Sequence, residues 1–101
     1  MEVNVKERHC HLSERNREQI ERRIRFDFDR FSDKIRHVDV VVDDENGPRG
    51  GSDKRCSVHV KMDRWEDVFT SALAEDPVKA ASLSADRAVR RIVKIKDQFE
   101  H

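Results

Sequence analysis

Residues 76–99, DPVKAASLSADRAVRRIVKIKDQF, have the clearest helical pattern in the chain. Asp76 can cap the exposed amides, and Pro77 suits the first helical position, where its missing N–H costs nothing. Apolar residues recur on one side and basic residues cluster on the other. The apolar set is Ala81, Ala85, Ala88, Val89, Ile92, Ile95 and Phe99, and the basic set is Arg87, Arg90, Arg91 and Lys94. This pattern predicts a helix from Val78 to about Phe99 that covers a core with its apolar face.

Four segments before this helix are typical of strands: the first three alternate apolar and polar residues, as half-buried strands do, and the fourth follows a turn at residues 63–66. They span residues 2–6, 37–43, 55–62 and 67–73. Valines supply most of the apolar positions in the first three. We therefore predict four strands, each with one face toward a core.

A second helix is predicted between the first two strands, from Glu14 to Phe31. Ser13 is placed to cap it, and Glu14 puts a negative charge in its first turn. Its apolar stripe consists of Ile20, Ile24, Phe28, Phe31 and Ile35. The order of elements is then β-α-β-β-β-α, which predicts an α+β fold in which a four-stranded sheet carries two helices on one face.

The composition limits the class of protein. The chain has 101 residues, of which 42% are charged and 36% are hydrophobic. This size predicts a single domain over residues 1–101 and excludes a two-domain enzyme. No apolar run could span a membrane, the N-terminus has no apolar signal segment, and the cysteines are Cys10 and Cys56 alone. We therefore expect a cytoplasmic protein with no membrane partner.

The basic face of the last helix is the main candidate binding site. Lys+Arg and Asp+Glu both number 21, and a net charge of zero argues against indiscriminate nucleic-acid binding, so no DNA partner is expected. Residues 86–96 nevertheless hold five basic residues and one acid. Such clustering favours contact with a phosphate backbone, and a solvated outer face is the alternative. The candidate RNA-binding residues here are Arg87, Arg90, Arg91, Lys94 and Lys96.

A second candidate is the loop of residues 43–55, which is rich in Gly, Pro, Asn and Asp. It contributes the basic residues Arg49, Lys54 and Arg55. Its glycines lack the spacing of a phosphate-cradling loop, and no helix follows, so a nucleotide site is not expected. The loop is interpreted either as an RNA or protein contact or as a flexible hairpin connection.

Residues that could carry metal or catalytic chemistry form no complete set. In the run His9-Cys10-His11, only the two histidines would face the same way, and the spacing of a four-ligand zinc site is absent. No nucleophile has a recognisable base partner. We expect no metal, no cofactor and no enzymatic activity. Trp65, at a predicted hairpin tip, either covers the sheet edge or stacks on a base or partner.

Three stretches of the chain resemble the ribosome hibernation factors, the family of hibernation-promoting factor and ribosome-associated inhibitor A, long known as sigma-54 modulation proteins. Residues 30–35, followed by Val38, Val40 and Val42, look like the end of the family's first helix and its second strand. Residues 67–76 look like its fourth strand and the start of its last helix. The spacing of its basic helix is matched by Asp86, Arg87, Arg90, Ile92, Lys94, Lys96 and Asp97.

This resemblance implies the β-α-β-β-β-α fold and a translation inhibitor of resting or stressed cells. It implies binding to the small ribosomal subunit, in the channel used by messenger and transfer RNA. It also implies that Arg87, Arg90, Lys94 and Lys96 contact ribosomal RNA phosphates, whereas the role of Arg91 rests on the helical pattern alone.

The chain departs from the better-known members in two respects, and the charge of its first helix is nearly balanced. The loop of residues 43–56 is longer and richer in glycine, which resembles a divergent branch. No counterpart of the long-form dimerisation domain precedes His101, so we do not expect the chain to pair ribosomes by that route. Between Glu14 and Phe31, six Arg stand against five Asp+Glu, so a weaker RNA contact is expected on the first helix.

Two other functions are kept as alternatives. One is a protein-interaction module of a stress response, which keeps the fold without binding ribosomes and uses the first helix and the long loop. A pull-down insensitive to ribonuclease would favour it. The other is a small metal- or ligand-binding enzyme that uses His9, His11 and the glycine loop, and metal bound to the purified protein would favour it.

Overall fold

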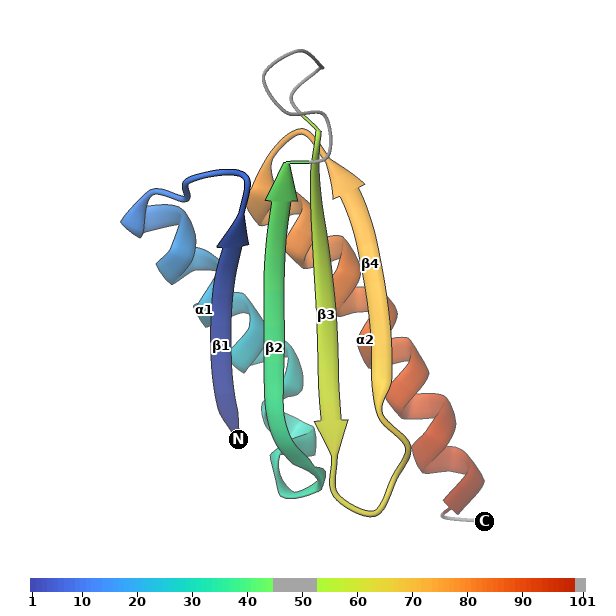
Figure 1. The fold of residues 1–101 in the computed structure, drawn as a ribbon. Coiled ribbons are helices and arrows are strands. Elements are labelled where there is room, and N and C mark those ends of the chain that lie inside the picture. The colour runs from blue at the N-terminus through green and yellow to red at the C-terminus, as the bar shows by residue number, and fades with distance from the viewer. Residues whose placement is uncertain (45–52, 100–101) are drawn as a thin grey trace.

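A computed structural model describes residues 1–44 and 53–99 and contains the predicted elements in the predicted order (Figure 1). The strands are β1 (Glu2–Arg8), β2 (Ile35–Asp44), β3 (Lys54–Met62) and β4 (Val68–Ala74). The helices are α1 (Glu14–Phe28), a short 3₁₀ helix (Asp29–Lys34) and α2 (Pro77–Phe99). The β-α-β-β-β-α order is therefore confirmed.

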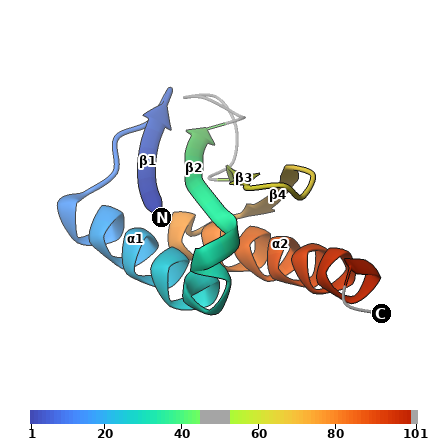
Figure 2. The same cartoon turned by 90° about the horizontal axis from the view of Figure 1, so that it is seen from below.

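The four strands form one mixed sheet in the order β1-β2-β3-β4. β1 is parallel to β2, and the other two pairs are antiparallel. Parallel neighbours need a crossover connection, which α1 supplies, whereas a short turn suffices between β3 and β4. Both helices lie on the same face of the sheet, which leaves the other face open (Figures 1 and 2).

The core lies between the sheet and the two helices. Alternate strand residues point into it, so valines of β2 and β3 are fully buried. α1 fills its share with large side chains, whereas α2 presents mostly alanine to the sheet. The fully buried hydrophobic members are Val38, Val40, Val42, Cys56, Val58 and Val60 from the strands, Ile20, Ile24 and Phe28 from α1, and Ala80, Ala81, Ala85, Ala88 and Ile92 from α2.

Both predicted helix caps are confirmed. The Ser13 hydroxyl accepts a hydrogen bond from the Asn16 amide at 3.0 Å at the start of α1. The Asp76 carboxylate accepts one from the Val78 amide at 2.9 Å at the start of α2. Each cap satisfies an amide that has no partner inside its helix.

Two expectations about the helix ends are wrong. α1 ends at Phe28 and not at Phe31, and Ile35 begins β2. Phe31 and Ile35 are nevertheless buried, because the 3₁₀ helix keeps a spacing of about three residues per turn. Phe99, assigned to the apolar face of the last helix, is 63% exposed and stacks on Trp65, with ring centroids 5.9 Å apart.

Candidate nucleic-acid interface

The predicted basic residues of α2 lie on its outer side. The face of α2 that packs on the sheet consists mostly of alanine and isoleucine. The basic residues on the other side point away from the core and are exposed: Arg87, Arg90, Arg91 and Lys94. Lys96 follows Lys94 by two residues, about 200° around the helix, and is half-buried. The structure therefore groups four of the five candidates and separates Lys96 from them. We call the four the basic stripe.

The members of the basic stripe differ in their contacts. The Arg87 guanidinium donates a 2.5 Å hydrogen bond to the Ser71 carbonyl. Arg91 Nη2 lies 3.9 Å from Glu66 Oε1, and both side chains are well exposed, so this ion pair contributes little. Within residues 1–44 and 53–99, neither Arg90 nor Lys94 has a hydrogen-bond or ion-pair partner. These two cations are thus available to a ligand.

An arginine of α1 contacts Asp86, the one acid among residues 86–96. Arg23 Nη2 lies 3.4 Å from Asp86 Oδ1, and Arg23 Nε lies 2.9 Å from Asp27 Oδ2. The hydrogen bond to Asp27 is the main reason that the pKa of Arg23 is raised above its ordinary value. Asp86 lies four residues before Arg90, the position at which an acid would pair with it on a helix. Its contact with Arg23 leaves the charge of the stripe less compensated.

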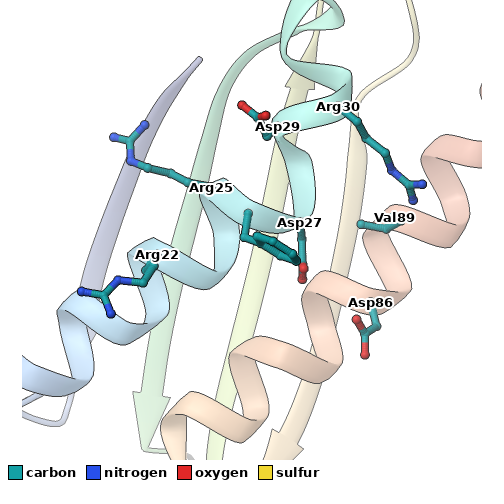
Figure 3. A pocket seen from close by; sticks show the side chains of 8 residues that line it. Arg22, Arg25, Asp27, Asp29, Arg30, Asp86 and Val89 are labelled. Carbon is teal, nitrogen blue, oxygen red and sulfur yellow. The ribbon is translucent and has the colours of Figure 1, made fainter.

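The groove between α1 and α2 is balanced in charge (Figure 3). It has a volume of about 770 Å³. Its cations are Arg22, Arg25 and Arg30, its acids are Asp27, Asp29 and Asp86, and Phe26 and Val89 complete the lining. Arg22 and Arg25 extend away from α2, and Arg30 extends toward it (Figure 3). Because Arg25 also pairs with Glu21 at 3.2 Å, the groove does not continue the basic stripe.

Of the candidates predicted in the loop, Lys54 and Arg55 are the first residues of β3 and have different partners. Arg49 lies outside the described residues. Lys54 is half-buried, with Nζ 3.3 Å from Asp44 Oδ2. The Arg55 guanidinium donates a 3.2 Å hydrogen bond to the Ser71 hydroxyl. Since Arg87 binds the carbonyl of the same residue, two of the predicted basic residues meet at Ser71.

Two exposed aromatic residues are not among the site residues predicted from the sequence. Phe26 on α1 is 80% exposed, and Phe69 on β4 is 73% exposed. Phe26 breaks the period of its own element, since it lies off the stripe that contains Phe28, and Phe69 alternates with the buried Val68. A large apolar residue in the polar phase of an amphipathic element is the signal that would have identified Phe26. Both phases of β4 contain apolar residues, so the sequence alone does not mark Phe69 as exposed.

The two histidines of the run His9-Cys10-His11 contact different carboxylates. His9 Nδ1 lies 3.1 Å from Asp43 Oδ1, whereas His11 Nδ1 lies 3.7 Å from Glu7 Oε1. Burial raises the pKa of the Cys56 thiol to about 11, so it stays protonated at neutral pH. Over residues 1–44 and 53–99, no group of three or more His, Cys, Asp or Glu is placed to hold a metal ion. No helix in these ranges is long and apolar enough to cross a membrane.

Known structures share this fold. A ribosomal subunit interface protein from Coxiella burnetii superposes with a TM-score of 0.79 at 17% sequence identity, over 96% of this chain and 99% of that one. The N-terminal domain of Protein Y from Thermus thermophilus gives a TM-score of 0.75 at 18% identity, over 93% and 98% of the two chains. At such identities the likeness concerns the fold. A search of curated proteins finds no match.

The family, in contrast, follows from the sequence. The family model described as "Sigma 54 modulation protein / S30EA ribosomal protein" matches residues 3–100, which is nearly the whole chain. The shared fold of the solved structures agrees with the element order and with the sheet that carries both helices on one face. The chain belongs to the sigma 54 modulation protein / S30EA ribosomal protein family.

Proposed function

We propose that this protein is a translation inhibitor that binds the small ribosomal subunit in the channel for messenger and transfer RNA. Its family and its likeness to a ribosomal subunit interface protein support association with the ribosome. Ribosomal RNA supplies the phosphates for the basic residues, and ribosomal proteins line the rest of the site. The protein acts without catalysis, in the cytoplasm, and occupies space that the translation ligands need.

The observation that carries this proposal is the uncompensated charge of α2. Arg90 and Lys94 are exposed, one turn apart, and have no partner among the described residues. The nearest acid of the stripe, Asp86, is bound by Arg23. Phosphates that follow the helix can therefore bind both cations without displacing an existing ion pair. Arg87 and Arg91, which have weak or backbone partners, extend the footprint toward β4.

The test is co-sedimentation of the protein with purified small subunits through a sucrose cushion, at low and high salt. Wild-type protein is expected in the pellet at low salt and in the supernatant at high salt, because phosphate contacts release counterions. The double variant Arg90→Glu with Lys94→Glu replaces attraction by repulsion at two phosphates. We expect its affinity to fall by more than about tenfold, with an unchanged circular dichroism spectrum.

A matched control reverses the same number of charges elsewhere. Lys6→Glu with Arg8→Glu alters two exposed residues of β1, at the opposite edge of the sheet from β4. We expect this control to bind like the wild type. If α2 and β1 variants lose retention equally, net charge and not the basic stripe governs binding. If the α2 variant binds like the wild type, the assignment of the stripe fails.

Inhibition itself has a separate readout. Labelled initiator transfer RNA bound to small subunits is expected to be displaced by the wild-type protein and not by the Arg90→Glu, Lys94→Glu variant. Retention on the subunit without displacement would contradict the proposed blocking of the channel. Absence of retention at low salt would favour the alternative of a protein-interaction module.

A further inference from the structure

We propose that the open face of the sheet carries a stacking site for an unpaired RNA base, built on Phe69. The site lies on the face opposite the helices, so it is separate from the basic stripe of α2. The inference rests on the proposed function in one respect, because it identifies the second kind of contact that a ribosomal RNA partner would make.

The ring of Phe69 is held flat against His59. The two rings are 3.9 Å apart between centroids, and their planes differ by 14°. His59 Nε2 lies 3.3 Å from Asp67 Oδ2, and Asp67 Oδ1 accepts a 3.1 Å hydrogen bond from the Met62 amide. The hydrogen bond from the Met62 amide is the main reason that the pKa of Asp67 is lowered below its ordinary value. The contact of Asp67 with His59 thus helps to fix the histidine ring behind Phe69.

Although His59 backs the ring, Phe69 remains 73% exposed. A ring with one face supported and much of its surface open can stack with a base at little cost in conformational entropy. A hollow of about 320 Å³ lies beside it, lined by Ser57, Phe69, Thr70 and Ser71. The serine hydroxyls can donate to or accept from the polar edge of a base.

Cations and acids both lie on this part of the sheet, and the cations belong to β3. β3 contains Lys54, Arg55 and Lys61 and no acid, and β4 contains no charged residue. Among the acids, Asp44 pairs with Lys54, Asp39 stands opposite His59 in the sheet and Asp67 contacts His59. Arg55 lies within hydrogen-bond distance of Ser71, one of the residues that line the hollow. Cations beside an exposed ring are the combination that sheet-based RNA-binding domains use.

The same observations favour a base over a protein surface. The large exposed apolar side chains of this face, within the described residues, are Phe69 and Leu73, which is too little for the apolar centre of a stable protein interface. The base must be unpaired, since the faces of bases in a duplex are covered by their neighbours. The expected ligand is therefore a single-stranded segment of RNA.

Fluorescence anisotropy with two labelled RNA probes tests this site at low salt. One probe is a short oligouridylate, whose bases are unpaired, and the other is a fully paired RNA duplex of equal charge. Phe69→Ala is expected to weaken binding of the oligouridylate by about tenfold. Binding of the duplex and the salt dependence of both are expected to stay unchanged, because no phosphate contact is removed.

The chain offers a matched control in Phe26, which is as exposed as Phe69 but lies on α1. Phe26→Ala is expected to bind both probes like the wild type, and Phe69→Trp to keep the affinity for oligouridylate. The proposal is overturned if Phe69→Ala binds oligouridylate as the wild type does, if it loses both probes equally, or if the wild type does not bind oligouridylate.

Co-sedimentation separates this proposal from the proposed function. In one outcome, the wild-type protein is retained on small subunits and Phe69→Ala binds every probe as the wild type does. This result would support the ribosomal function and overturn the stacking site. Protein that binds oligouridylate through Phe69 but is not retained on small subunits keeps the stacking site and removes the ribosomal function. Loss of subunit retention in Phe69→Ala, with unchanged oligouridylate binding, overturns the base contact in favour of a ribosomal protein contact.

Discussion

The two helices pack on the same face of one sheet, but they use their charges and their cores differently. α1 buries Ile20, Ile24 and Phe28 and engages Arg23 and Arg25 with acids. α2 buries a row of alanines, and its cations Lys79, Arg90 and Lys94 have no partner among the described residues. The same holds for Arg15 and Arg22 of α1.

The difference shows that the acids in contact with a cation affect the charge of a helix surface more than the number of its cations does. Arg and acid residues of α1 nearly balance, and the contact from Arg23 to Asp86 removes an acid from the neighbouring helix as well. The contact from Arg23 thus raises the effective positive charge of α2, and the pairs of Arg23 and Arg25 with acids neutralise part of the charge of α1. A helix with many arginines can therefore be the weaker RNA ligand of the two.

The largest expected effect is on the free energy of unfolding, and it compares the large core side chains of α1 with the core alanines of α2. Phe28→Ala removes a fully buried ring from α1 and is expected to lower the free energy of unfolding by about 3–5 kcal/mol. Ala85→Leu forces extra volume between α2 and the sheet and is expected to cost about 1–3 kcal/mol. Urea unfolding followed by circular dichroism measures both. A cost below about 1 kcal/mol for either variant would contradict the packing contrast.

An intermediate effect concerns the charges. Arg90→Gln is expected to reduce the slope of log affinity against log salt by about 0.7–0.9, the contribution of one phosphate contact. Arg25→Gln on α1, whose guanidinium pairs with Glu21, is expected to leave that slope unchanged. Titration of labelled small subunits at several salt concentrations gives both values. Equal changes in the two variants would show that α1 contributes as much as α2.

The smallest effect concerns pH and the start of α1. The Glu7 carboxylate accepts a 2.5 Å hydrogen bond from the Leu12 amide, which is the main cause of its lowered pKa, and the charges of His11 and Arg17 add to it. Because the pKa is lower in the folded state, this contribution to stability is present above the ordinary pKa of 4.5 and is lost as the pH falls through the folded value.

Hydrogen exchange at neutral pH and at about pH 3 checks this expectation. Protection of the α1 amides is expected to fall more than protection of the α2 amides on acidification. Glu7→Gln is expected to reduce α1 protection at neutral pH and to remove part of its pH dependence. Equal losses of protection in α1 and α2 on acidification, in both the wild type and Glu7→Gln, would exclude a specific role for this carboxylate.

Much of the fold could be predicted from the sequence because it depends on short periods. Alternating valines predict β2 and β3, and the capping residues Ser13 and Asp76 predict where the helices begin. The end of α1 could not be predicted, because a 3₁₀ turn keeps Phe31 and Ile35 facing the core at nearly helical spacing.

Less of the candidate site could be predicted, since it depends on contacts between distant residues. The helical period places Arg90 and Lys94 outward, but it says nothing of the contact between Arg23 and Asp86, which are 63 residues apart in sequence. The meeting of Arg55 and Arg87 at Ser71 needs the register of β3 with β4 and the position of α2. The exposure of Phe69 could not be predicted, because both phases of β4 contain apolar residues.

The bond from Arg87 to Ser71 also bears on solubility. β4 is an edge strand of seven residues, and none of them is charged or proline. Such an edge is a template for the strand of another molecule, which would extend the sheet and lead to aggregation. Arg87 places a charged group on a backbone carbonyl in the middle of this strand. The same side chain that is a candidate for RNA contact therefore acts as a gatekeeper against self-association.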